Sequence, residues 1–153
     1  MYASVLWLHS WIRWIVLGLA VLAWTRALFG RTPEAWTAGT EDPVSRWFLR
    51  AFDLQFMLGL LMVVALSPIT RAAFSDISAT MGQSLLRFYL IEHPFGMIAA
   101  LACAHIGRAR AARSATAIGA RRTTARFYGM AIALMLLSIP WPFLRAGRPL
   151  FRW

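Results

Sequence analysis

Three histidines are the side chains of this chain with the clearest capacity for chemistry. They are His9, His93 and His105, and each lies within a long apolar stretch. An imidazole is costly to place in hydrocarbon without a partner, so a histidine inside a membrane span marks a candidate functional site. Neutral imidazole is also the commonest metal ligand in proteins. The sequence therefore predicts a functional site where two of these histidines meet between helices.

Four apolar runs predict the helices that hold these side chains. They cover residues 2–29, 47–66, 83–107 and 124–144. A run of about 20 residues spans roughly 30 Å of hydrocarbon at about 1.5 Å per residue. Short polar links, with Ser78 or Thr80 expected to cap the third helix, make consecutive helices antiparallel. We therefore expect an all-α integral membrane protein, a single four-helix transmembrane domain with up-down-up-down topology.

Composition supports the same class of protein. The chain has 153 residues, of which 59% are hydrophobic and 14% are charged, whereas soluble chains average about 45–50% apolar and roughly 25% charged residues. All 16 basic residues are arginines and the net charge is +10. The arginines lie mainly at helix ends and in loops, where they are expected to contact lipid headgroups. This position does not indicate binding to nucleic acid. A single cysteine, Cys103, excludes an intramolecular disulfide, and no nucleophile triad, paired carboxylates or phosphate loop is present.

The distribution of arginines predicts the orientation in the membrane. The first and third loops with their flanks hold most of them, namely Arg26, Arg31, Arg46, Arg50, Arg108, Arg110, Arg113, Arg121, Arg122 and Arg126. The positive-inside rule places these loops in the cytoplasm. Both termini are then on the periplasmic side of a bacterial inner (cytoplasmic) membrane. Interfacial anchoring is expected for Trp7, Trp11, Trp47, Trp141 and Trp153.

Depth selects which histidines pair. The helical rise places His9 about 10 Å and His93 about 15 Å below the outer surface of the membrane. His105 differs from His9 in depth by roughly 20 Å. We expect His9 and His93 to be the two axial ligands of a single b-type haem. The alternatives are polar packing, or a zinc or copper site, for which only Glu92 is close in sequence. His105 is expected to hydrogen-bond a neighbouring helix. Metal binding is the alternative, and a kink of its helix at Pro94 would change the direction in which His105 points.

Two arginines are candidates for binding the propionate carboxylates of a haem. Arg13 follows His9 by four residues and lies on the same helix face. An arginine at that depth needs a partner. An ion pair with Glu92 and a charge-assisted bond to a haem propionate are both open. Arg87, nearer the surface, is the second candidate for the propionate.

Polar and small residues elsewhere in the spans raise further expectations. Asp53 is expected to pair with Arg50 or Arg26, and the alternative is a role in carrying protons toward a quinone. Three glycines permit the close approach of a neighbouring helix or of a macrocycle: Gly59, Gly96 and Gly129.

The chain also resembles a known family over nearly its whole length. The resemblance lies in Leu8-His9-Ser10 with Arg13-Trp14, Asp53-Leu54-Gln55 with Gly59-Leu60, Arg87-Phe88, Glu92-His93, His105-Ile106-Gly107-Arg108, Ile139-Pro140-Trp141-Pro142-Phe143 and Gly147-Arg148-Pro149. These segments resemble small bacterial four-span membrane proteins, common in Bacteroidetes and usually labelled "cytochrome b". The resemblance implies b-type haem and electron transfer. The third loop departs from it, being rich in arginine where those proteins have lysine.

We therefore expect an electron-transfer protein or complex subunit, rather than a stand-alone enzyme. Its expected partners are the bilayer and either a quinone or a larger redox membrane complex. Assembly of several copies is left open. The alternative is an accessory subunit that carries no cofactor and packs against a larger respiratory or photosynthetic complex. Transport is less expected, because no internal repeat or pair of interrupted helices is present.

Overall fold

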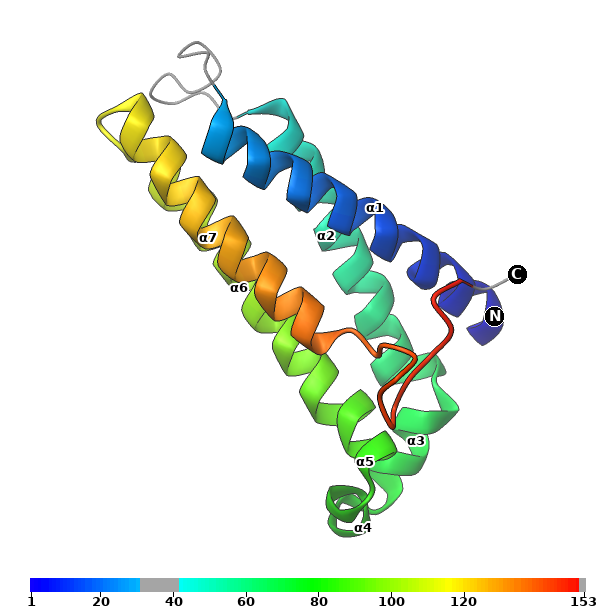
Figure 1. The fold of residues 1–153 in the computed structure, drawn as a ribbon. Helices are drawn as coiled ribbons and strands as arrows, with labels where there is room; N and C mark the ends of the chain where they lie inside the picture. Colours follow the sequence, from blue (N-terminus) through cyan, green and yellow to red (C-terminus); the bar gives the residue numbers. More distant parts are fainter. Residues whose placement is uncertain (31–41, 152–153) are drawn as a thin grey trace.

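The computed structural model describes residues 1–30 and 42–151, and this part of the chain is helical without strands. Its elements, shown in Figure 1, are α1 (Tyr2–Phe29), α2 (Pro43–Leu61), η2 (Met62–Leu66), α3 (Pro68–Ser75), α4 (Ile77–Gly82), α5 (Ser84–Arg87), η3 (Phe88–Glu92), α6 (His93–Ala112) and α7 (Ala117–Ser138). Arg31, Trp153 and most of the first predicted loop lie outside the described residues.

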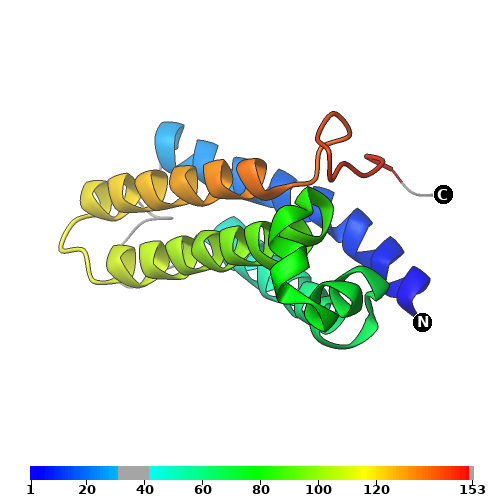
Figure 2. The same ribbon diagram turned by 90° about the horizontal axis from the view of Figure 1, so that it is seen from below.

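The four long helices α1, α2, α6 and α7 lie side by side (Figures 1 and 2), with the chain direction alternating from each to the next. Helix α6 packs along α7, and α1 packs against both α2 and α7. Small side chains in the core allow these close approaches. The fully buried core residues include Val16, Ala20, Ala23, Phe48, Phe52, Ala104, Tyr128 and Ala131.

Three helical stretches of the described chain are long and apolar enough to cross a membrane. They are Tyr2–Phe29, Pro43–Leu66 and Ser84–Ala112. The three stretches support the prediction of a membrane protein, and they correspond to three of the four predicted spans. Helix α7 has a length of 22 residues, but its last 18 residues contain Arg121, Arg122 and Arg126. Charged side chains at these positions reduce the apolar length of α7.

The predicted bounds of the last helix were wrong at both ends. Helix α7 begins at Ala117, because the Thr116 side chain accepts a hydrogen bond from the Gly119 amide and caps it. It ends at Ser138 instead of residue 144. Proline at position 140 disfavours helical geometry in Ile139, which is extended. The second helix likewise starts earlier than predicted, at Pro43, where the Asp42 carboxylate caps the Ser45 amide.

The predicted loop before the third span contains two short helices instead. Ser67 caps α3 through the Thr70 amide, and Asp76 caps α4 through the Ala79 amide. The expectation that Ser78 or Thr80 caps the third span was therefore wrong. Thr80 lies inside α4, where its hydroxyl donates to the carbonyl of Ala73 at 2.9 Å.

Two π-helical turns interrupt the apolar helices. The first, η2, ends α2, and the second, η3, directly precedes His93 and Pro94. Proline has no amide to donate to the carbonyl of Leu90, and its ring would collide with that carbonyl in a regular helix. A wider turn accommodates it, so the predicted distortion at Pro94 takes this form. Such π turns are frequent at functional sites.

An ion pair connects α1 to the start of α2, at the end of the bundle away from the π turns. The Arg26 guanidinium donates through Nε and Nη2 to Oδ1 of Asp42, at 3.0 and 2.9 Å. The other carboxylate oxygen accepts the Ser45 amide at 3.1 Å. Asp42 is buried, and these bonds satisfy both of its oxygens. Arg26 therefore pairs with Asp42 and not, as considered above, with Asp53.

The three glycines singled out above each face a side chain of a neighbouring helix. A Cβ atom at Gly129 would lie 3.0 Å from Nε1 of Trp24, and one at Gly59 would lie 3.2 Å from Cε1 of His9. At Gly96 it would overlap the side chain of Ser138. Close helix approach is therefore observed at all three positions.

Replacing Gly96 by alanine is expected to force α6 away from Ser138 at the end of α7. Overpacking of this kind typically costs about 1–3 kcal/mol, so the thermal midpoint of the protein in detergent should fall. Gly18→Ala is the matched control, because nothing lies within 4 Å of a Cβ at Gly18. A glycine-to-alanine change in a helix is otherwise stabilising by up to about 1 kcal/mol. Equal midpoints for the two variants would contradict the packing described here.

Candidate functional site

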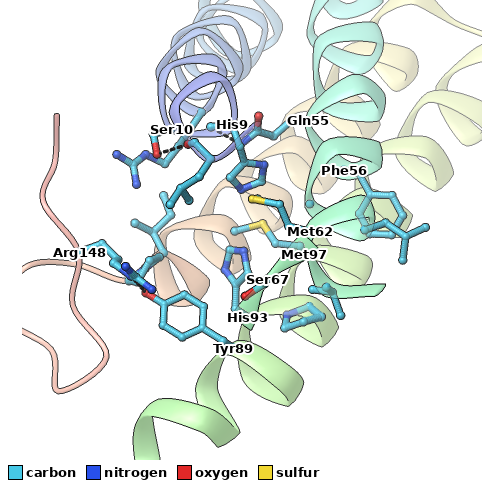
Figure 3. Close-up of a pocket in the computed structure, with 18 of the residues that line it drawn as sticks. His9, Ser10, Gln55, Phe56, Met62, Ser67, Tyr89, His93, Met97 and Arg148 are labelled. Atoms are coloured by element: carbon cyan, nitrogen blue, oxygen red, sulfur yellow. Dashed lines mark hydrogen bonds between the residues drawn. The ribbon is translucent and has the colours of Figure 1, made fainter. Parts of the chain in front are cut away.

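A cavity of about 160 Å³ lies where α1, α2 and α6 meet the two π turns. The last described residues, 139–151, form a C-terminal segment without regular structure that also contributes to its wall. Most of the lining is apolar. The polar lining residues include Arg13. Figure 3 labels several others, namely His9, Ser10, Gln55, Tyr89, His93 and Arg148.

His9 and His93 meet in this cavity. Helix α1 supplies His9 and helix α6 supplies His93, and the two ring centroids are 6.4 Å apart with the ring planes at 76°. Both imidazoles point into the same space in Figure 3. The structure therefore brings together the two histidines that the sequence paired by their depth.

One hydrogen bond fixes the chemical state of the His93 ring. Its Nδ1 lies 2.7 Å from the carbonyl oxygen of Ser138. A carbonyl can only accept, so Nδ1 must carry the proton. In the neutral ring, Nε2 then holds the lone pair and can bind a metal. Histidines that bind metals are commonly oriented in this way by a carbonyl on the other ring nitrogen. The ring of Phe88 stacks on His93 and restricts its rotation.

The carbonyl of Ser138 needs a donor because of the prolines that follow it. In a continuing helix this carbonyl would accept from position 142, which is proline and has no amide hydrogen. Pro140 removes the donor for Leu136 in the same way. The Trp141 indole instead donates to the Leu136 carbonyl at 2.7 Å. The imidazole of His93 donates to the Ser138 carbonyl.

His9 is held by its backbone more than by its ring. The side-chain amide of Gln55 donates to the His9 carbonyl at 2.8 Å, and the ring packs against Gly59 of α2. The Nδ1 atom of His9 and Oε1 of Gln55 are buried without a hydrogen-bond partner among the described residues. A buried polar atom of this kind is costly unless a ligand or water satisfies it.

Positive charge gathers at one side of the cavity. Arg13 and Arg148 both line it, and no acidic residue is among the described lining residues. Arg13 donates through Nη2 to the Leu150 carbonyl at 2.7 Å. Arg148 donates through Nε to the Tyr89 hydroxyl at 3.0 Å, and its guanidinium lies 5.1 Å from the centre of the Tyr89 ring.

The C-terminal segment returns from α7 toward the start of α1 (Figure 1). The Trp14 indole donates to the Leu150 carbonyl at 3.2 Å, and Phe151 stacks on the Trp14 ring at 5.5 Å. The Tyr89 hydroxyl donates to the Ala146 carbonyl at 2.8 Å. These contacts hold the segment, with Arg148, against the cavity.

Arg87 does not line the cavity. Its Nε donates to Glu92 at 2.7 Å, and both side chains are partly exposed. Of the two partners left open for Arg13, Glu92 is therefore excluded, because Arg87 lies five residues from Glu92 on the same continuous helix and binds that carboxylate. Arg87 was predicted to bind a propionate, but the structure places it in this ion pair instead.

His105 contacts the neighbouring helix. Its Nε2 lies 2.8 Å from Oδ1 of Asp53 on α2, and neither residue lines the cavity. The expected hydrogen bond to a neighbouring helix is thus observed. Asp53 was expected to pair with Arg50 or Arg26, and this was wrong because His105 reaches it across the helix contact.

A macrocycle and a metal ion place different requirements on the cavity. Its volume of about 160 Å³ is below the roughly 300–1,000 Å³ of typical ligand pockets. A macrocycle therefore needs it to widen, and the unbranched, flexible side chains of Met62 and Met97 line it. The described residues contain no group of three or more His, Cys, Asp or Glu side chains placed to bind a metal. Two axial ligands are all that a haem requires of the protein.

Three residues contribute to this site without having been predicted from the sequence. Tyr89 and Arg148 were not assigned to it, and Ser138 contributes only a backbone carbonyl. The Pro-Trp-Pro run at 140–142 was the available signal for the carbonyl, because two prolines leave two helix carbonyls without donors. Nothing in the sequence shows that the C-terminal segment folds back to bring Arg148 to the cavity.

Replacing Trp14 by phenylalanine is expected to loosen the C-terminal segment while keeping the ring stacked on Phe151. The change removes one donor to the Leu150 carbonyl, worth about 1 kcal/mol. Hydrogen exchange at the amides of Gly147 and Arg148 should therefore accelerate about fivefold. Trp47→Phe is the control, since Trp47 is 61% exposed. Unchanged exchange in the Trp14 variant would show that this bond does not hold the segment.

Comparisons with known proteins return no match to a family model, a curated protein or a solved structure.

Proposed function

We propose that the chain is a membrane-embedded b-type haem protein that exchanges electrons with a quinone or another redox subunit. The observation that carries the proposal is the placement of His9 and His93 on different helices with their rings in one cavity, 6.4 Å apart. Metal–imidazole bonds of about 2 Å, with about 1 Å more to each ring centre, place two axial rings roughly 6 Å apart. The observed separation agrees with this value.

The state of the His93 ring supports axial ligation. The Ser138 carbonyl holds the Nδ1 proton of His93, so Nε2 is the nitrogen directed to a ligand. His9 has a buried Nδ1 atom without a hydrogen-bond partner among the described residues. In the proposal, both imidazoles bind the iron of a single haem. Arg13, which also lines the cavity, binds a propionate by a charge-assisted hydrogen bond.

The chemistry that follows is electron transfer. A haem whose two axial positions are both filled by the protein supplies one-electron transfer in place of oxygen chemistry. The walls around the two imidazoles are mainly apolar. We further propose that α7 is a fourth span and that both termini face the periplasm of a bacterial inner membrane. The arginine-rich loops would then lie in the cytoplasm.

A second candidate function is that of an accessory subunit without a cofactor. The bonds of His93 to Ser138 and of His105 to Asp53 favour it, because they give histidines purely structural partners. Purification at a fixed stoichiometry with a larger membrane complex, without haem, would support this candidate over the first.

Replacing either His9 or His93 by alanine is expected to abolish the low-spin haem spectrum, or to leave a five-coordinate high-spin species. His105→Ala is the matched control, because His105 also bonds across a helix contact but lies outside the cavity lining. Its spectrum should be nearly unchanged. The measurement is a reduced-minus-oxidised absorption spectrum of protein produced with ample haem.

Two outcomes would contradict the proposal at different levels. If the unaltered protein shows no b-type spectrum, the haem function is wrong. If His105→Ala loses the haem while His9→Ala keeps it, the assignment of the ligands is wrong but the function stands.

A further inference from the structure

Gln55 lies in the wall of the cavity with one end of its amide bonded and the other end unsatisfied. The residue is buried, with 8% of its surface exposed, and it lines the cavity. Its Nε2 donates to the His9 carbonyl at 2.8 Å. Because a carbonyl only accepts, this bond fixes which end of the amide faces α1. Oε1 is then a buried acceptor without a donor among the described residues, which is costly.

The ring of His9 presents a complementary atom to the same helix. A Cβ atom at Gly59 would lie 3.2 Å from Cε1 and 3.8 Å from Nδ1 of His9, so this edge of the ring faces α2. Gln55 precedes Gly59 by four residues and lies on the same face of α2. The Nδ1 atom is buried without a hydrogen-bond partner among the described residues. Figure 3 shows His9 and Gln55 next to each other.

Several other donors in the cavity wall already have acceptors. They are the hydroxyls of Ser10, Thr70 and Tyr89 and the guanidinium groups of Arg13 and Arg148. The backbone carbonyl of Gln55 is a competing acceptor close to the His9 ring. Within α2, however, that carbonyl already accepts the amide of Gly59. Oε1 of Gln55 is therefore the acceptor that gains most from a protonated Nδ1 of His9.

We propose that Gln55 is the positioning residue of His9. Its Nε2 holds the backbone of His9, and its Oε1 accepts the Nδ1 proton when Nε2 of the ring binds the iron. Rotation of the ring and of the terminal amide then pairs two buried atoms that are otherwise unsatisfied. The Ser138 carbonyl has the same role for His93, and histidines that bind metals are commonly oriented in this way.

This inference rests on the proposed haem function. It adds the residue that selects the tautomer of His9 and that controls the basicity of this ligand. A more basic imidazole stabilises ferric over ferrous iron, so Gln55 also influences the reduction potential.

Two substitutions of Gln55 separate its acceptor from its donor. Gln55→Met keeps the length of the side chain and removes both groups, whereas Gln55→Glu keeps an oxygen acceptor. NMR of the reduced, haem-loaded protein with ¹⁵N-labelled histidine detects the Nδ1–H groups of His9 and His93. The His9 signal should exchange slowly in the unaltered protein and in Gln55→Glu, and be lost to fast exchange in Gln55→Met. The His93 signal should persist in all three, because its acceptor is Ser138.

Haem affinity and midpoint potential provide a second readout. Loss of the group that orients a metal-binding histidine typically weakens metal binding about 10- to 100-fold, so Gln55→Met should bind haem at least about tenfold more weakly. Its ratio of ferrous to ferric affinity should rise about two- to tenfold, which raises the potential by about 20–60 mV at about 59 mV per tenfold. The potential of Gln55→Glu should equal that of the unaltered protein or lie below it.

Gln83→Met is the matched control. Gln83 is exposed and lies outside the lining of the cavity, so this variant should match the unaltered protein in affinity, potential and NMR signals. Thermal midpoints in detergent show whether each variant remains folded. Gln55→Glu tests the acceptor by itself if Gln55→Met does not fold.

Two results would overturn the inference while leaving the haem function intact. Loss of the His9 signal in Gln55→Glu would show that the Nε2 donor, and not the oxygen acceptor, is what matters. Retention of the signal in Gln55→Met would assign the bond to the backbone carbonyl of residue 55. Absence of a low-spin spectrum in the unaltered protein would instead overturn both the proposed function and this inference.

Discussion

The hydrogen bond between the His93 imidazole and the Ser138 carbonyl is the interaction on which the candidate site depends. It exists because α7 ends there and position 142 is proline, so the helix supplies no donor for this carbonyl. Gly96 lets α6 approach closely enough for the ring to reach it. One orphaned carbonyl thus fixes the ring, its tautomer and the nitrogen that faces the cavity.

Charge divides the molecule into two ends with different roles. At one end, buried Asp42 and Arg26 neutralise each other where α1 meets the start of α2. At the other, Arg13 and Arg148 line a cavity without any described acidic lining residue. A closed ion pair stabilises helix packing and leaves no charge for a ligand. At the second end the two arginines lie in the wall of the cavity.

The three histidines show how tertiary contacts separate identical side chains. His9 and His93 line the cavity, and Gly59 of α2 leaves room for the ring of His9. His105 instead contacts Asp53 on the next helix. For His93 and His105 the neighbour across the helix contact, and not the apolar sequence around the histidine, determines which ring nitrogen is engaged.

The sequence by itself determined the helical, apolar character of the chain and the pairing of His9 with His93, because helix length and periodicity follow from local composition. It did not determine the ends of helices that prolines and capping side chains set, such as Ser138. Nor could it assign Arg148, or the partners of Asp53 and Glu92. Those depend on which helix faces meet and on how the C-terminal segment folds back, and only the tertiary structure decides such contacts between residues far apart in the chain.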